Sequence, residues 1–134
     1  LNVLLDLPNF EVPITVDPQK IISVFENLLE NAFNHAKELS RITIRLKIIE
    51  KQTMALCEIE DDGQTTIAPA EIAKLFERFY RVDKSRSRAR GGTGLGLSIV
   101  KDIIEAHNGQ IVAKQSKIGG LIFTFKLPLQ AKDS

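Results

Sequence analysis

Three asparagines and a histidine recur along one predicted helix at spacings that place them on a single stripe. The stripe consists of Asn27, Asn31, Asn34 and His35. Residues three, four, seven and eight apart lie above one another on a helix, and asparagine is a poor helix former. An amide oxygen is a neutral, hard ligand of the kind that Mg²⁺ takes together with water. The stripe therefore indicates a magnesium site, with a solvated polar helix face as the alternative.

A glycine-rich run precedes a second predicted helix. It reads Gly91-Gly92-Thr93-Gly94-Leu95-Gly96-Leu97. Glycines let backbone N–H groups approach an anion closely, and the start of a helix adds the positive end of its dipole. The run is neither a P-loop nor a dinucleotide fingerprint placed directly after a strand. It follows a segment rich in Arg, residues 78–90, so the pair indicates an anion site, with a solvated loop and a flexible linker as alternatives.

An acidic pair closes an apolar strand at Asp61-Asp62-Gly63. A carboxylate at a strand end can accept a hydrogen bond from an exocyclic amine such as that of adenine. An ordinary Asp-Gly turn explains the same residues. Taken together, the amide stripe, the strand-end carboxylate, the basic segment and the glycine-rich helix start are the parts of a Mg-nucleotide site.

Hydrophobic periodicity predicts the scaffold that has to bring these parts together. It gives strands over residues 1–7, 12–16, 42–49, 54–60, 110–115 and 121–127, and helices over 18–36, 69–76 and 95–106. Asp17 and Pro18 are typical of a helix start, and His107-Asn108-Gly109 of a helix end. Residues 81–92 carry no apolar period and are expected to form a mobile loop. The order predicts an α+β two-layer sandwich, a mixed sheet with helices on one face.

Composition sets the limits of this picture. The 134 residues suit one domain over 1–134, and a net charge of +1 gives no reason to expect a nucleic-acid partner. Cys57 is the one cysteine, and its place in an apolar alternation favours a buried strand residue over a nucleophile. No apolar run approaches the roughly 20 residues that a membrane span needs. The first residue is not Met, so we expect a piece of a longer protein.

Four segments, in this order, resemble the catalytic and ATP-binding domain of sensor histidine kinases, within the GHKL superfamily. They are ENLLENA at 26–32, DDG at 61–63, LFERFYRVD at 75–83 and GGTGLGLSIVKDIIEAHNG at 91–109. They are similar to the asparagine box, the first glycine box, the phenylalanine box and the second glycine box of that family. The resemblance covers nearly the whole chain and implies the Bergerat fold, with ATP and Mg²⁺ as ligands.

The resemblance also implies roles for individual residues. Asn31 would ligate Mg²⁺ and Asn27 would help to hold the phosphates. Asp61 would bind the adenine amino group, with Gly63 letting the backbone approach the base. Residues 81–92 would form the ATP lid, from which Arg86, Arg88 or Arg90 would reach the terminal phosphate. The remaining implied ATP contacts are Asn34, His35, Ile67, Thr93, Gly94, Leu95, Gly96 and Leu97. Phe76 and Phe79 would anchor the start of the lid, and core packing explains them almost as well.

One position separates a kinase from an ATPase in this resemblance. Members that hydrolyse ATP have a Glu four residues before the metal asparagine, and here Asn27 stands there, which cannot act as a general base. On the helix, Glu30 is offset by about 100° from Asn31, and Glu26 by about as much from Asn27. Both carboxylates are expected to be exposed. The nucleophile is therefore expected from outside the chain, as a histidine on the dimerisation domain of a parent kinase. Neither His35 nor His107 stands in a phosphoacceptor pattern, and His107 is expected to cap a helix.

Several residues depart from the family pattern. Asn34 replaces a usual Lys, His35 a Tyr, Thr65 the second glycine of the first glycine box and Leu121 a Thr near the base. These changes imply weaker ATP binding or altered base recognition. The readings that compete with a kinase domain are a self-sufficient GHKL ATPase, a degenerate docking module and a relative of the anti-sigma-factor kinases.

Partners and location follow from the resemblance alone. The expected partners are the dimerisation and histidine phosphotransfer domain of the same kinase and a cognate response regulator. The parent is expected to be a membrane-anchored homodimer with this domain in the cytoplasm, and the piece on its own can be a monomer.

Overall fold

Five strands form one mixed sheet that carries the rest of the domain. The computed structural model describes residues 1–36, 38–51, 53–64, 66–80 and 96–130. The sheet order is β1-β2-β3-β5-β4, with bounds β1 (Asn2–Asp6), β2 (Arg41–Ile49), β3 (Met54–Asp61), β4 (Gln110–Gln115) and β5 (Leu121–Pro128). The β1–β2 pair is parallel and the other three pairs are antiparallel. The mixed sheet predicted from the sequence is confirmed.

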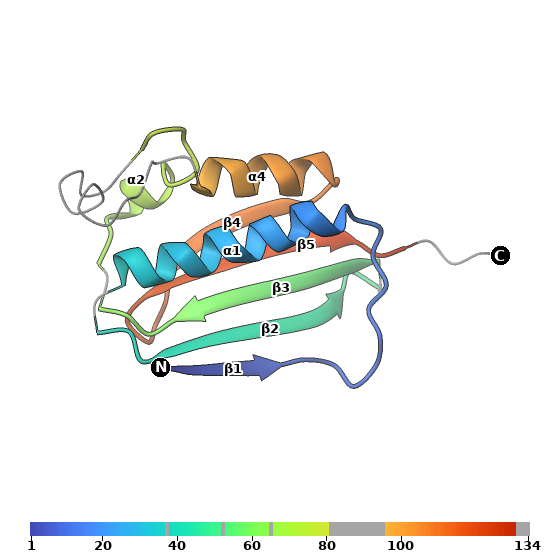
Figure 1. Cartoon of the computed structure of the whole chain (residues 1–134), viewed down its shortest axis with the longest axis horizontal. Helices are drawn as coiled ribbons and strands as arrows, with labels where there is room; N and C mark the ends of the chain where they lie inside the picture. Colours follow the sequence, from blue (N-terminus) through green and yellow to red (C-terminus); the bar gives the residue numbers. More distant parts are fainter. Residues whose placement is uncertain (37, 52, 65, 81–95, 131–134) are drawn as a thin grey trace.

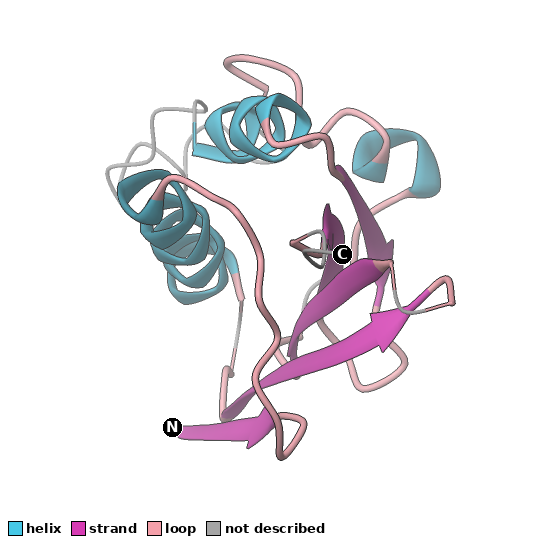
Figure 2. Ribbon diagram, turned by 90° about the vertical axis from the view of Figure 1, so that its right-hand side faces the viewer, coloured by secondary structure: helices cyan, strands magenta, loops and turns pink. Residues whose placement is uncertain are grey.

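The helices supply the second layer. They are α1 (Pro18–His35), α2 (Pro69–Ile72) and α4 (Gly96–Ala106). Figures 1 and 2 show α1 and α4 side by side above one face of the sheet. This confirms the predicted two-layer sandwich. Among the described residues, no helix has the length and apolar character needed to span a membrane.

Helix α1 begins where its capping residues dictate. The Asp17 carboxylate accepts hydrogen bonds from the N–H groups of Gln19 (3.0 Å) and Lys20 (3.4 Å), and Pro18 fills the first helical position. Such a cap satisfies N–H groups that have no partner inside the helix. The apolar stripe of α1 then buries Val24, Leu28 and Ala32 in the core. The helix is thereby fixed in rotation, with its asparagines beside the buried face.

Alternation along the strands builds the other wall of the core. On β3 and β5, every second side chain is buried, which is expected of a sheet with one covered face. Phe125 of β5 meets Phe25 of α1 edge to face, with ring centroids 5.8 Å apart. The covered face of β3 runs from Ala55 through Cys57 and Ile59 to Asp61. The same alternation that buries the core therefore aims Asp61 at the helices.

His107 joins the start of α1 to the end of α4. Its Nε2 accepts a hydrogen bond from the Asp17 N–H at 3.1 Å, so its Nδ1 carries the proton and donates to the Ile103 carbonyl at 2.8 Å. Asn108 then takes a positive φ of 63° and the Gly109 N–H returns to the Ile104 carbonyl, as at many helix ends. The predicted helix end and the capping role of His107 are confirmed.

Two predicted elements need correction, and a third is not tested. Residues 12–16 are not a strand, because Pro13 lacks an N–H group and only Ile14 forms a bridge, to Leu129. Helix α2 ends at Ile72 and gives way to turns before residue 76. The predicted loop over residues 81–92 lies outside the described residues.

The environment of Cys57 leads to a test of the core. Burial, with a smaller effect from Glu58, raises the pKa of the Cys57 thiol to about 12. The reactive thiolate is therefore scarce at neutral pH. We expect the native protein to react with a thiol reagent such as DTNB at least about 100-fold more slowly than the urea-unfolded chain, which serves as control. Equal rates in the two states would contradict the buried placement.

Candidate functional site

The carboxylate of Asp61 lies at the end of β3, under the helical layer. It is 7% exposed. Oδ1 accepts a hydrogen bond from the Gly63 N–H at 3.0 Å, and Oδ2 accepts one from the Leu121 N–H at 3.4 Å. Burial raises the pKa of Asp61, and the two backbone hydrogen bonds partly offset that effect. Each oxygen keeps a second acceptor site, so the carboxylate is oriented and still able to bind a donor.

Two glycines leave the space that this carboxylate occupies. A Cβ on Gly120 would stand 1.8 Å from Asp61 Oδ1, and a Cβ on Gly63 would stand 2.3 Å from Ala36 Cβ and 3.1 Å from the same Oδ1. No side chain fits at such distances without displacement of backbone or carboxylate. Gly63 and Gly120 thus bring the end of α1 and the β4–β5 hairpin directly against Asp61.

The residues before and after Asp61 brace the end of β3. Glu60 forms an ion pair with Arg45 at 2.8 Å and accepts a hydrogen bond from Ser116 Oγ at 2.5 Å. Asp62 accepts from the N–H groups of Ser40 and Arg41 and from the Ser40 hydroxyl, and the Ser40 side-chain bond leads the causes that lower the pKa of Asp62 to about 2. Of the acidic pair read from the sequence, Asp61 faces the site and Asp62 closes the loop before β2.

Asn27 meets the start of α4. Its Nδ2 donates to the Ser23 carbonyl at 2.7 Å and lies 3.2 Å from Ser23 Oγ. Its Oδ1 lies 3.0 Å from the point that a Cβ on Gly96 would occupy. The amide is therefore held by its nitrogen, and its oxygen is directed at the N-terminal end of the described part of α4. This brings Asn27 of the stripe beside Gly96, the first described residue of the glycine-rich run.

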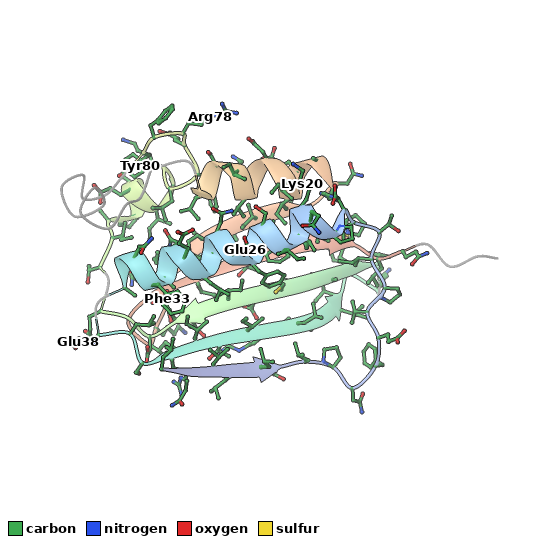
Figure 3. All side chains as sticks on the ribbon, viewed as in Figure 1. Lys20, Glu26, Phe33, Glu38, Arg78 and Tyr80 are labelled. Carbon is green, nitrogen blue, oxygen red and sulfur yellow. The ribbon has the colours of Figure 1, made fainter. Side chains whose placement is uncertain are left out.

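The other residues of the α1 stripe are placed less completely. Asn31 and Asn34 are half-buried on α1, one and two turns beyond Asn27, and the side chain of His35 lies outside the description. Glu26 and Glu30 are exposed, as expected, and Glu26 is labelled on α1 in Figure 3. The described residues contain no group of three or more His, Cys, Asp or Glu able to hold a metal ion.

The residues from 67 to 80 divide between core and surface. Ile67 is buried in the hydrophobic core, and Phe76 meets Phe123 edge to face with centroids 6.1 Å apart. Phe79 is 69% exposed with a positive φ of 65°. Core packing therefore explains Phe76 and does not explain Phe79.

Several predicted contacts fall outside the described residues. They are Arg86, Arg88, Arg90, Thr93, Gly94 and Leu95, together with Thr65. Gly96 and Leu97 open the described part of α4, where both are half-buried. The predictions for the lid and for most of the glycine-rich run remain predictions.

Sequence reasoning missed Gln115, at the end of β4. Its side-chain Oε1 accepts a hydrogen bond from the Ile67 N–H at 3.2 Å, and its Nε2 donates to the Gly120 carbonyl at 2.7 Å. No local pattern marks this glutamine, because its partners lie 48 residues before it and five residues after it. A hydrogen-bond requirement between two distant loops becomes visible only when the sheet register is known.

A surface hollow elsewhere on the molecule does not coincide with these residues. It measures about 690 Å³ and is lined by the end of β1, by Leu7, Pro8 and Phe10, by residues 45–48 of β2 and by Glu58 of β3. None of the sequence-predicted site residues lines it. The candidate site is defined instead by Asp61, Gly63, Asn27 and the start of α4.

Comparison with known proteins gives the family and the fold that the chain resembles. The profile of the family described as "Histidine kinase-, DNA gyrase B-, and HSP90-like ATPase" matches residues 16–131. The sensor histidine kinase WalK of Bacillus subtilis (strain 168) is 37% identical over 123 residues, which are 92% of this chain and 20% of WalK. The chain therefore spans about a fifth of the length of this curated relative.

Solved structures give the same result for the fold. The mycobacterial sensor histidine kinase MprB matches with a TM-score of 0.77 and 25% identity, over 97% of this chain and 84% of that one. Full-length ShkA, solved in complex with AMPPNP, matches with a TM-score of 0.79 and 22% identity, over 98% of this chain and 26% of that one. The latter likeness concerns the fold alone.

The close approach of Gly63 to Ala36 allows a double-mutant test of the site's geometry. Gly63→Ala is expected to lower the free energy of unfolding by about 1–3 kcal/mol, because the new methyl group overlaps the Ala36 Cβ. Ala36→Gly alone is expected to cost less than about 1 kcal/mol. In the double variant part of the loss is regained, a coupling of about 1 kcal/mol in urea denaturation. Strict additivity would contradict the contact.

Proposed function

The chain belongs to the histidine kinase-, DNA gyrase B- and HSP90-like ATPase family, and we propose that it binds Mg-ATP and donates the γ-phosphoryl group to a histidine of its parent kinase. The observation that carries this proposal is the buried carboxylate of Asp61, held by two backbone N–H groups at one end of the α1–α4 layer. Asn27 and the start of α4 lie further along the same layer. A nucleotide has a base and a phosphate chain. In this proposal Asp61 binds the base, and Asn27 with the start of α4 binds the phosphates.

The base is recognised by Asp61. Its two oxygens each retain one acceptor site after the bonds to Gly63 and Leu121, and the exocyclic amine of adenine is a matching donor. A guanine presents a carbonyl oxygen at the same ring position, which a carboxylate repels. The buried setting strengthens this discrimination, because an unpaired polar atom costs more away from water.

The phosphates are placed at the start of α4. The first N–H groups of a helix and its positive dipole end attract anions, and glycine at position 96 leaves room for the Asn27 amide oxygen at that point. Asn27 would hold the phosphate chain through its amide. The residues 93–95 and the lid arginines 86 and 88 complete the phosphate site in this proposal.

The metal is held by few protein atoms. Asn31, one turn beyond Asn27 on α1, offers a neutral amide oxygen, and Mg²⁺ commonly combines one or two protein oxygens with phosphate oxygens and waters. The donor set therefore suits a metal that arrives with ATP. Bound there, Mg²⁺ would neutralise negative charge on the phosphates during transfer.

The acceptor is supplied from outside the chain. A ring nitrogen of the acceptor histidine attacks the γ-phosphorus, a nitrogen–phosphorus bond forms, and the bond from that phosphorus to the bridging oxygen of ADP breaks. The proton on the other ring nitrogen is released to solvent. Asn27 cannot activate water as a general base, and Glu26 and Glu30 are exposed on α1. The domain therefore positions ATP for transfer and does not promote hydrolysis.

The proposed partners follow from this reaction. They are the dimerisation and histidine phosphotransfer domain of the parent kinase and, downstream, a response regulator that takes the phosphoryl group. We propose a homodimeric, membrane-anchored parent with this domain on the cytoplasmic side. A nucleic-acid partner is not part of the proposal, because the chain carries a net charge of only +1.

Calorimetric titration tests the nucleotide site. We expect the chain to bind ATP in the micromolar range with Mg²⁺ and more weakly without it. Asn31→Ala is expected to weaken Mg-ATP binding by at least about tenfold, or about 1.4 kcal/mol, because a metal ligand is lost. Asn9→Ala, at an exposed asparagine away from the site, is the matched control. No binding at millimolar nucleotide would favour the alternative of a degenerate docking module.

Incubation with γ-labelled ATP tests the missing nucleophile and base. The isolated chain is expected to acquire no stable label and to show no steady-state ATP hydrolysis above background. Hydrolysis that persists in Asn31→Ala would identify a contaminant. Magnesium-dependent turnover lost in that variant would instead establish a self-sufficient ATPase and contradict the kinase assignment.

A further inference from the structure

Gln115 links two segments that are far apart in the sequence, and one of them is in contact with Asp61. One is the stretch around Ile67, between β3 and α2, whose described residues form no regular structure. The other is the β4–β5 hairpin at Gly120. The Gln115 side chain accepts from the Ile67 N–H at 3.2 Å and donates to the Gly120 carbonyl at 2.7 Å. It therefore uses both ends of its amide at once.

The Gly120 end of this link is in contact with the base-binding carboxylate. A Cβ on Gly120 would stand 1.8 Å from Asp61 Oδ1, and the next residue, Leu121, donates its N–H to Asp61 Oδ2. The Gly120 carbonyl also accepts a hydrogen bond from the Ser116 N–H at 2.7 Å, which closes the turn between β4 and β5. A shift of Gly120 would move Asp61 directly.

At Ile67, the hydrogen bond to Gln115 adds to the anchoring that the buried Ile67 side chain provides. Ile67 is 8% exposed, so its side chain is anchored in the core. A buried side chain still permits rotation of the backbone around it, whereas a hydrogen bond from the N–H group sets its direction. Gln115 thus fixes the orientation of the Ile67 backbone relative to Asp61.

We propose that Gln115 is a positioning residue for base recognition, which holds the Ile67 segment and the Gly120 turn at a fixed separation around the adenine. The proposal rests on the function proposed above and adds a specificity determinant to that site. The amide is required because only a side chain with both a donor and an acceptor can serve the Ile67 N–H and the Gly120 carbonyl together. A carboxylate would accept from Ile67 and repel the carbonyl.

The test compares affinities for Mg-ATP, Mg-ITP and Mg-tripolyphosphate by calorimetry. Inosine triphosphate carries a carbonyl in place of the adenine amine, and tripolyphosphate carries no base. Gln115→Met keeps the length of the side chain and removes both hydrogen bonds. Gln115→Glu keeps the acceptor alone. Gln110→Met, at an exposed glutamine on the same strand, is the matched control.

We expect the wild type to prefer Mg-ATP over Mg-ITP, and Gln115→Met to reduce this preference about tenfold through weaker Mg-ATP binding. Tripolyphosphate binding should stay unchanged, and Gln110→Met should behave as wild type. Gln115→Glu should lose at least as much preference as Gln115→Met, and it carries the test alone if thermal melting shows Gln115→Met to be unfolded.

Two results would overturn the inference while leaving the proposed function intact. One is an unchanged ATP to ITP preference in a folded Gln115 variant. The other is an equal loss for all three ligands, which a merely structural role would produce. Failure of the wild type to bind Mg-ATP would overturn the proposed function and the inference with it.

Discussion

The site depends on a buried carboxylate that is held by backbone N–H groups instead of a cation. Asp61 accepts from Gly63 and Leu121, which belong to segments 58 residues apart in the sequence. Burial of a charge is costly unless it is hydrogen-bonded, so these two bonds are a condition for an ionised Asp61 at this position. The glycines at 63 and 120 follow from the same requirement, since side chains there would overlap Ala36 or the carboxylate.

Sheet register and helix contacts place Asp61, Asn27 and the start of α4 in one extended site. The register pairs Ile42 with Asp61 and places the β5 start beside the β3 end. At the other end of the helical layer, His107 connects the first residue before α1 to the last turn of α4. With both helices fixed in this way, Asn27 meets the start of α4, and the candidate base and phosphate anchors stand on one rigid frame.

Much of this arrangement could be predicted from the sequence because its causes are local. Asp17 and Pro18 predict the start of α1, and Asn108-Gly109 predicts the end of α4. The alternation of apolar residues in β2, β3 and β5 predicts which face of the sheet is covered. The strand expected over residues 12–16 was wrong because Pro13 removes a ladder hydrogen bond, so that a single bridge at Ile14 remains. The roles of Gln115 and of Ser23 beside Asn27 depend on tertiary contacts or on rotamer choice, which no spacing reveals.

A crystal structure of the chain with Mg²⁺ and a non-hydrolysable ATP analogue is the most direct test of this nucleotide site. We expect the adenine amine within hydrogen-bonding distance of Asp61, the phosphates between Asn27 and the start of α4, and the metal on Asn31. A nucleotide bound elsewhere, or bound here with its base turned away from Asp61, would contradict it.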